Sequence, residues 1–274
     1  MSNIYEYQDK KWKLPKVMLY CQIGGSTDMA EFAINGKYGA IKNAGLKYKK
    51  EFDIIFVCWK TPAHTYDWLK KNKFKYIEMP YDEGQGFLWN LYKGWNIGYP
   101  VCFDHGAEFV CPIATDHAFH KNWLKNLVKR GKDNRVVNCK LIEPGTLHTL
   151  HTTRNFGPTT EEEFNESGFV EFCNDLEKDE LAVDDIQGLF HENGGVGGTY
   201  GHRLDAMPFL VPKEVWKRFG PMKKVLNEFG TTGDTDFFDR CRTGGVEITK
   251  ALDAISYHCG GLETRRNEAK GVYT

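Results

Sequence analysis

Four side chains that can bind a metal ion or move a proton lie where predicted strands or helices begin or end. Asp116 follows an apolar run and precedes a predicted helix. Asp234 and Asp236 open another predicted helix, and His258 closes a predicted strand. A carboxylate at the point where a strand leaves an open α/β sheet faces the crevice in which such folds bind ligands. Carboxylates and an imidazole on separate elements therefore indicate a metal-assisted enzyme.

Each of these residues also has a purely structural interpretation. Asp116 could cap the helix that follows it, and its local sequence favours neither role. Helix capping is the simpler interpretation for Asp234 and Asp236, since acidic groups stabilise helix N-termini. A single histidine such as His258 is more often structural than a metal ligand. The histidine pairs His117/His120 and His148/His151 have helical spacing but no evident further ligands for a zinc site.

The acidic groups can take part in metal binding or in general-base catalysis. Mg²⁺ or Mn²⁺ is held by one or two carboxylates together with phosphate oxygens of the substrate. Such an ion neutralises the leaving group of a diphosphate-bearing substrate. A carboxylate in a closed pocket can act as a general base. Arg265 and Arg266 follow His258 in a polar tail that could fold over a diphosphate, because the planar donor fork of arginine suits phosphate.

Alternating strands and helices must position these groups. The chain has 274 residues, 41% hydrophobic and 14% aromatic, which is enough for a substantial core. Predicted strands cover 17–23, 52–59, 75–79, the apolar stretch that starts at 109 and precedes Asp116, 135–142, 207–211, 246–248 and 254–258. Predicted helices cover 29–32 continuing through 40–44, then 62–73, 87–97, 121–128, 213–219 and 234–242. The alternation and the apolar strands of the first half predict an α/β fold with a mostly parallel, Rossmann-like sheet covered by helices on both faces.

The second half is less regular. Residues 161–187 hold eleven acidic residues and one lysine, which indicates an insertion, a lid or a linker. We predict a lead-in at 1–15, two halves of one domain at 16–130 and 131–262, and a tail at 263–274.

Composition excludes several classes of protein. A formal net charge of -1 and a pI of about 6.8 argue against a nucleic-acid partner. The eight cysteines form no Cys-x-x-Cys pair, and Cys21 and Cys58 lie in apolar runs, which is typical of a reducing compartment. The polar N-terminus does not resemble a signal peptide, and no apolar run approaches the roughly 20 residues of a membrane span. We therefore expect a cytoplasmic protein without a transmembrane segment.

The order of these features, over roughly residues 16–262, resembles family 2 glycosyltransferases of the GT-A fold. That family carries an Asp-x-Asp at the end of a central strand. Asp116 matches its second, metal-binding aspartate, whereas Ala114 stands in place of the first. The Trp-Leu pair that follows is matched by Trp123 and Leu124.

Later motifs extend the resemblance. The turn at 219–222 matches a Gly-Pro turn of the family, and 232–237 matches its Glu-Asp helix opening, with Gly233 in place of the glutamate. Asp234 thus falls at the general base, and His258 at a late histidine of the metal site. Residues 83–86 and Asn90 resemble a glycine-rich turn and an asparagine of the third helix, and Arg240 with 244–245 matches the Arg-x-x-x-x-Gly pattern.

The resemblance implies an inverting hexosyltransferase that moves a sugar from a nucleotide-diphosphate donor to a saccharide or other hydroxyl acceptor. Residues 16–130 would bind the donor, and 131–262 would face the acceptor. Mn²⁺ or Mg²⁺ would bind Asp116 and His258, and Asp234, with Asp236 beside it, would form the catalytic group. The implied nucleotide-sugar contacts are Gln22, Asp53, Asp82, Asn90, Arg265 and Arg266.

Two other functions are also consistent with the sequence. A nucleotidyltransferase can use a similar core and one metal ion, but it needs a basic phosphate loop after the first strand, and residues 24–27 contain no lysine or arginine. A non-catalytic nucleotide- or sugar-binding protein on the same fold would explain Ala114 and Gly233, the two positions that lack the acidic residue of the family.

Overall fold

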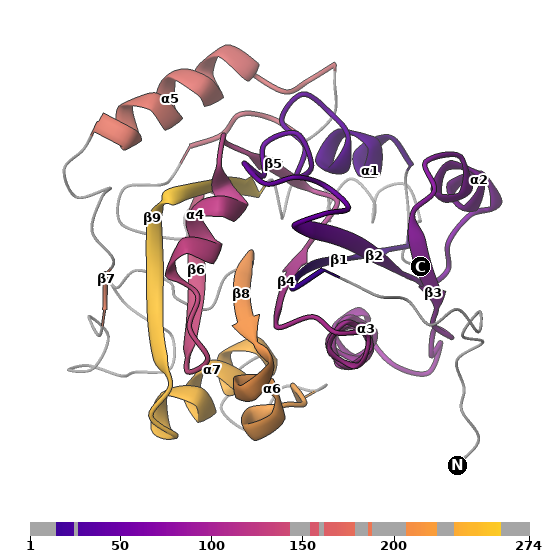
Figure 1. Ribbon diagram of the computed structural model, residues 1–274. Coiled ribbons are helices and arrows are strands. Elements are labelled where there is room, and N and C mark those ends of the chain that lie inside the picture. The colour runs from indigo at the N-terminus through magenta and orange to yellow at the C-terminus, as the bar shows by residue number, and fades with distance from the viewer. Residues whose placement is uncertain are drawn as a thin grey trace.

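The computed structural model describes residues 15–24, 27–142, 154–158, 162–178, 186–187, 207–223 and 233–258. The strands are β1 (Val17–Ile23), β2 (Phe52–Cys58), β3 (Lys75–Glu78), β4 (Phe109–Ile113), β5 (His117–Phe119), β6 (Arg135–Ile142), β7 (Ile186–Gln187), β8 (Phe209–Pro212) and β9 (Glu247–His258). The helices are α1 (Thr27–Ile34), α2 (Ala63–Lys71), α3 (Phe87–Asp104), α4 (Trp123–Arg130), α5 (Glu166–Lys178), α6 (Lys213–Phe219) and α7 (Gly233–Thr243). Figure 1 shows their arrangement.

The strands form one mixed sheet in the order β3-β2-β1-β4-β8-β6-β9-β5, and β7 pairs with β9. The longest ladders are parallel: β1 with β2 and β4, β2 with β3, and β6 with β9. Short antiparallel β8 joins β4 to β6 and so links the two halves of the sheet. The expected mostly parallel α/β sheet is therefore confirmed in this coarse form.

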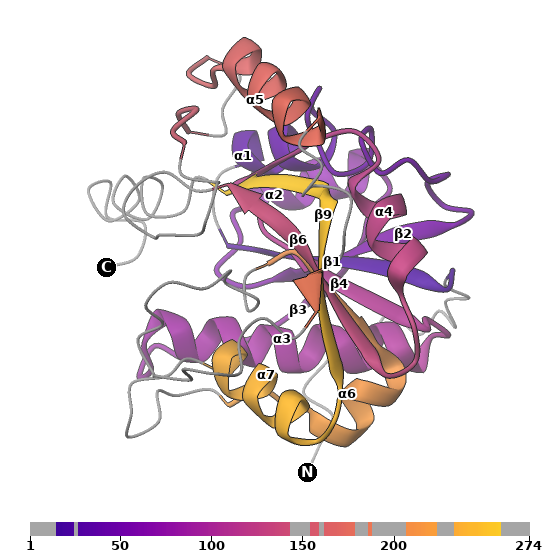
Figure 2. The ribbon, with the colours of Figure 1, turned by 90° about the vertical axis from the view of Figure 1, so that its left-hand side faces the viewer.

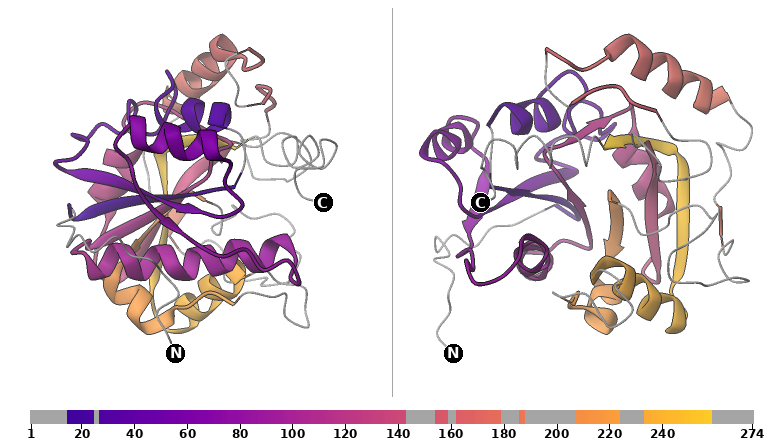
Figure 3. Two further views of the ribbon diagram at one scale, coloured as in Figure 1. Left: turned by 90° about the vertical axis from the view of Figure 1, so that its right-hand side faces the viewer. Right: turned by 180° about the vertical axis from the view of Figure 1, so that it is seen from behind.

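Helices cover both faces of the sheet. Helices α3, α6 and α7 lie on one side, and α1, α2 and α4 lie on the other (Figures 2 and 3). Two separate hydrophobic cores fill the space between the helices and the sheet, one on each face. All seven residues of β2 are buried, as expected for a parallel strand covered on both sides.

Helix α3 packs directly against side chains of β1 at two glycines. A Cβ atom at Gly94 would stand 2.1 Å from Gln22 Oε1, and one at Gly98 would stand 2.8 Å from the Tyr20 ring. The helix runs to Asp104, so the predicted end at residue 97 was wrong. Burial of apolar residues beyond Gly98, such as Tyr99, outweighs the helix-breaking tendency of glycine and proline there.

Three further parts of the structure differ from the prediction, namely the first helix, strand β5 and the last strand. The first helix ends at Ile34 and does not continue to residue 44. The chain turns after Ile34, and a Cβ atom at Gly36 would lie 2.4 Å from the Phe32 carbonyl oxygen, so this turn has no room for a side chain at residue 36. Strand β5, between Asp116 and the next helix, was not predicted because it is only three residues long.

The last two predicted strands are one strand, β9, with a local irregularity. Cys139 of β6 pairs with Ala251, but the next residue, Lys140, pairs with Ile255, so three residues of β9 have no partner in β6. Figure 1 shows the strand turning sharply near its end. Extra residues in one strand of a pair bend that strand, and here the bend directs His258 towards β5.

Helix α5 lies within the acidic segment 161–187, so the described part of this segment contains regular structure. Its apolar face, including Phe169 and Cys173, packs against Tyr257 of β9 and Ala118 of β5 in a third core cluster. Among the described residues, no helix has both the length and the apolar character that a membrane crossing requires.

Candidate metal centre

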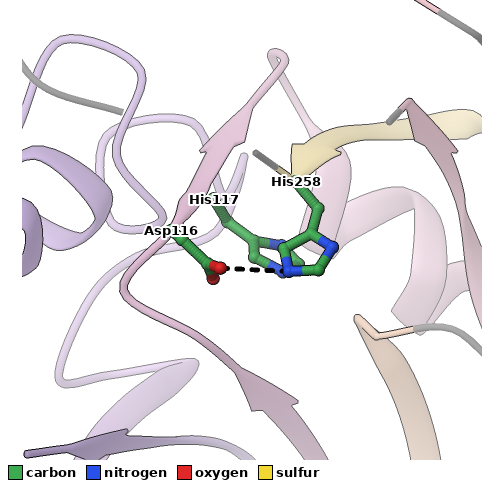
Figure 4. Close-up of side chains that lie close together, drawn as sticks. All are labelled: Asp116, His117 and His258. Carbon is green, nitrogen blue, oxygen red and sulfur yellow. Dashed lines mark ion pairs between the residues drawn. The ribbon is translucent and has the colours of Figure 1, made fainter. Parts of the chain in front are cut away.

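Asp116, His117 and His258 meet where β4 leaves the sheet. The chain turns after β4 through Ala114 and Thr115 to Asp116, and β5 begins at His117. Strand β5 pairs antiparallel with the end of β9, which places His117 directly opposite His258. Figure 4 shows the three side chains pointing towards one another.

The distances within this group suit a small ion. His258 Nε2 lies 3.1 Å from Asp116 Oδ2, and the ring centroids of His117 and His258 are 4.8 Å apart. One ligand atom from each residue can be chosen so that all three lie within 4.8 Å of one another. We name Asp116, His117 and His258 the Asp-His-His cluster.

Burial leaves polar atoms of the cluster unsatisfied. The His117 side chain is fully buried, and neither of its ring nitrogens has a hydrogen-bond partner among the described residues. Asp116 Oδ1 is likewise buried and without a hydrogen bond in that part of the chain. Leaving a buried polar group unsatisfied costs about 1–3 kcal/mol, so these atoms are available to a ligand.

The cluster also shifts the protonation of its members. Burial lowers the pKa of His117 from 6.5 to about 3, and repulsion from His258 adds to this effect, whereas attraction to Asp116 opposes it. Burial alone would raise the pKa of Asp116, but the charge and hydrogen bond of His258, together with His117, hold that pKa well below its usual range. A neutral imidazole and an ionised carboxylate are the forms that bind metals.

These observations fit a metal ion and reject the capping interpretation of Asp116. The carboxylate bonds to His258, and strand β5 separates it from helix α4, which begins at Trp123. The group Asp116, His117 and His258 could therefore hold a metal ion. The sequence did not predict His117 as a ligand. Its spacing from His120 is that of neighbours on a helix, but His117 lies on a strand, where that spacing does not show which side chains are close together.

No known protein-family model matches the chain, and no curated protein sequence matches it significantly.

Gln22 lies at the expected edge of the sheet, but its side chain has structural partners. Its Nε2 donates a hydrogen bond to the Leu91 carbonyl oxygen at 2.8 Å, and its Oε1 accepts one from Trp59 Nε1 at 3.1 Å. Gln22 therefore ties β1 to α3 at the carboxyl end of the parallel strands.

Asp82 and Asn90 organise the turn before α3. Asn90 is fully buried; its Oδ1 accepts a hydrogen bond from Asp82 N at 2.9 Å, and its Nδ2 donates to the Asp82 carbonyl oxygen at 3.0 Å. Asp82 Oδ1 accepts a bond from Gly84 N at 3.1 Å. The buried Asn90 side chain thus holds the 82–86 turn in place through these hydrogen bonds.

The structure does not bring Asp53 to this edge. It is the second residue of β2 and pairs with Met18 near the start of β1. The carboxyl end of β2 is five residues further on, a distance of about 17 Å at the usual rise of a strand. The Asp53 side chain is almost completely buried and forms an ion pair with Lys75 of β3. Asp53 thus lies away from the edge that holds Asp116 and Gln22, and its role as a nucleotide contact stays a prediction.

Asp234 and Asp236 lie in the first turn of α7 but have different surroundings. Asp234 Oδ1 accepts hydrogen bonds from Tyr92 OH at 2.9 Å and from Thr235 N at 3.0 Å. Asp236 forms ion pairs with Lys223 at 2.7 Å and Arg240 at 2.8 Å. Burial would raise the pKa of Asp236, but these two cations outweigh it and lower the pKa.

Asp236 belongs to a structural network. Arg240 also donates hydrogen bonds to the Phe219 and Pro221 carbonyl oxygens and so ties the turn after α6 to α7. Both oxygens of Asp236 are bonded to cations, which leaves this carboxylate poorly placed to accept a proton. Asp234 is the better candidate for a base.

Gly233 has no room for a side chain. A Cβ atom there would stand 2.0 Å from the Lys223 carbonyl oxygen and 3.0 Å from the Tyr92 ring. The Lys223 carbonyl and the Tyr92 ring together close this position to any side chain, and Tyr92 also contacts the neighbouring Asp234. Tyr92 carries no sequence motif, and its role appears only from the packing of α3 against α7.

A chain of contacts puts Asp234 and the Asp-His-His cluster at the same edge of the sheet. Asp234 bonds to Tyr92, which is adjacent to Leu91 on α3, and Leu91 accepts a bond from Gln22 near the end of β1. Strand β1 pairs with β4, whose carboxyl end leads directly into Asp116. Arg265 and Arg266 lie outside the described residues.

Proposed function

We propose that this protein is a metal-assisted inverting glycosyltransferase that moves a sugar from a nucleotide-diphosphate donor to a hydroxyl acceptor. The Asp-His-His cluster at the carboxyl edge of the parallel strands carries the proposal, because open α/β sheets bind ligands there. Asp116, His117 and His258 would hold the ion. When bound, the ion would neutralise the charge that develops on the departing diphosphate.

Asp234 is the proposed general base. It takes the proton from the acceptor hydroxyl while that oxygen forms a bond to the anomeric carbon. The bond from this carbon to the diphosphate oxygen breaks, and the nucleoside diphosphate leaves with the electron pair. A single displacement from the face opposite to the leaving group inverts the anomeric configuration.

Tyr92 positions that base. Its hydroxyl donates to Asp234 Oδ1 and so restricts rotation of the carboxylate. Tyr92 is nearly fully buried on α3, whose close packing on β1 depends on Gly94 and Gly98. A base held on rigid helices retains the geometry that proton transfer requires.

Donor binding and donor turnover test this proposal separately. A thermal-shift screen with UDP-, GDP-, ADP- and dTDP-linked sugars, each with and without Mn²⁺, should reveal a donor that stabilises the folded protein. Release of nucleotide from that donor then measures turnover, with water as the acceptor where no better acceptor is known. Asp234→Asn should keep donor binding and lose about 10²–10⁴ in rate.

Asp239→Asn provides the matched control. Asp239 lies on the same helix, is more than half exposed and pairs only with Arg242 in the described structure. The Asp239→Asn enzyme should release nucleotide at the same rate as the wild type. Near-normal turnover of Asp234→Asn would reject Asp234 as the base.

A non-catalytic nucleotide-sugar-binding protein is the second candidate, favoured by Ala114 and Gly233 in place of acidic residues. It would show a donor-induced thermal shift with no nucleotide release in the wild type. A nucleotidyltransferase would instead consume nucleoside triphosphate and release pyrophosphate.

A further inference from the structure

We propose that His117 is a direct metal ligand and that the resulting site, one carboxylate and two imidazoles, selects first-row transition-metal ions such as Mn²⁺, Co²⁺ or Zn²⁺ over Mg²⁺ and Ca²⁺. This deepens the proposed function by naming the class of metal. The metal site itself does not depend on which reaction the protein catalyses.

The strand geometry directs His117 into the cluster. Side chains alternate along a strand, and the neighbours Ala118 and Tyr257 point to the opposite face, where they pack with α5. His117 and His258 are direct partners across the β5–β9 pair, so their side chains project from the same face. The buried His117 ring therefore faces His258 and Asp116, and not solvent (Figure 4).

The separations suit coordination. Two ligand atoms about 2.1 Å from one ion, in adjacent positions at a right angle, lie about 3.0 Å apart. His258 Nε2 and Asp116 Oδ2 are 3.1 Å apart. The three atoms lie within 4.8 Å of one another, so small side-chain adjustments would bring His117 to the same ion.

The donor set determines which ions bind. Mg²⁺ and Ca²⁺ prefer oxygen ligands, and the cluster offers only one carboxylate. Imidazole suits Zn²⁺, Co²⁺ and related ions, and affinity for nitrogen sites rises along the series from Mn²⁺ to Cu²⁺. Two nitrogen donors therefore favour a transition-metal ion.

The cluster is buried on one side and open on another. The Asp116 and His258 side chains are 18% and 25% exposed, whereas His117 is fully buried. Three protein ligands with an accessible side are typical of metal sites that also bind water or substrate. The arrangement thus leaves room for substrate oxygens on the ion.

Metal binding can be measured directly on the full chain after treatment with a chelator and without any nucleotide. Calorimetric titrations with MnCl₂, CoCl₂, ZnCl₂ and MgCl₂ should give one site per chain for the first three ions, with Mg²⁺ at least tenfold weaker. His117→Gln should weaken Mn²⁺ binding by more than the roughly 10–100-fold typical of losing a supporting residue around a metal. His64→Gln, on the exposed surface of α2, should bind as the wild type does.

Pulsed EPR of the Mn²⁺-loaded wild type provides a test that needs no variant. Coupling to two imidazole nitrogens is expected, and His117→Gln should retain one. Equal affinity for Mg²⁺ and Mn²⁺, or a spectrum with fewer than two nitrogen ligands in the wild type, would overturn the inference. A two-nitrogen site in a protein that binds no donor sugar would refute the proposed function alone.

Discussion

Acidification should destabilise the metal-free protein through His117. The pKa of this residue is 6.5 in the unfolded chain and about 3 in the folded state, because burial and the neighbouring His258 disfavour the charged ring more than Asp116 favours it. Between these two values the unfolded chain binds a proton that the folded protein excludes. The free energy of unfolding therefore falls as the pH drops below 6.5.

The size of this loss in the free energy of unfolding follows from the shift in the pKa of His117. Each pH unit within this window costs about 1.4 kcal/mol, so lowering the pH from 7.5 to 5 should cost about 2 kcal/mol through His117 alone. Asp116 does not contribute over this range. Its lowered pKa provides stability that is fully present above the unfolded value of 3.8 and is lost only in stronger acid.

Urea unfolding of the chelator-treated protein at pH 7.5 and pH 5 measures this contribution. The wild type and the exposed-site control His64→Gln should lose about 2 kcal/mol more than His117→Gln. An equal loss in all three proteins would show that His117 is not held neutral by burial. The reasoning about the cluster would then be refuted, although the metal could still bind.

Three further substitutions test the other contacts. Tyr92→Phe should leave donor affinity unchanged, reduce turnover about tenfold and move the acid limb of the pH–rate profile upward, because the ionised Asp234 loses a hydrogen-bond donor. Gly233→Ala should lower the free energy of unfolding by about 1–3 kcal/mol in urea, since the new methyl group meets a backbone carbonyl. Asp53→Asn should cost about 1–3 kcal/mol by leaving Lys75 without its charged partner, with no change in donor affinity by calorimetry. If Asp53→Asn lowered the affinity for the donor, Asp53 would belong to the nucleotide site.

Local patterns predicted the parallel part of the sheet well. Strands β1, β2, β3 and β4 were expected almost at their observed bounds, because buried parallel strands are continuous apolar runs. Helix ends were less predictable, since the tertiary packing of α3 outweighs the glycines and proline inside it. Strand β5 is too short for a sequence pattern, and only its pairing with β9 defines it.

The candidate site, too, was predicted only in part from the sequence. The sequence placed Asp116, His258 and Asp234 at the ends of predicted elements as candidate site residues, and the resemblance to a known family favoured that role over a structural one. Only the tertiary structure decided that His117 joins Asp116 and His258, because the bend in β9 and the β5–β9 register bring together residues far apart in the chain. Likewise, only the packing of α3 against α7 placed Tyr92 on Asp234, since a contact between helices leaves no local sequence signal.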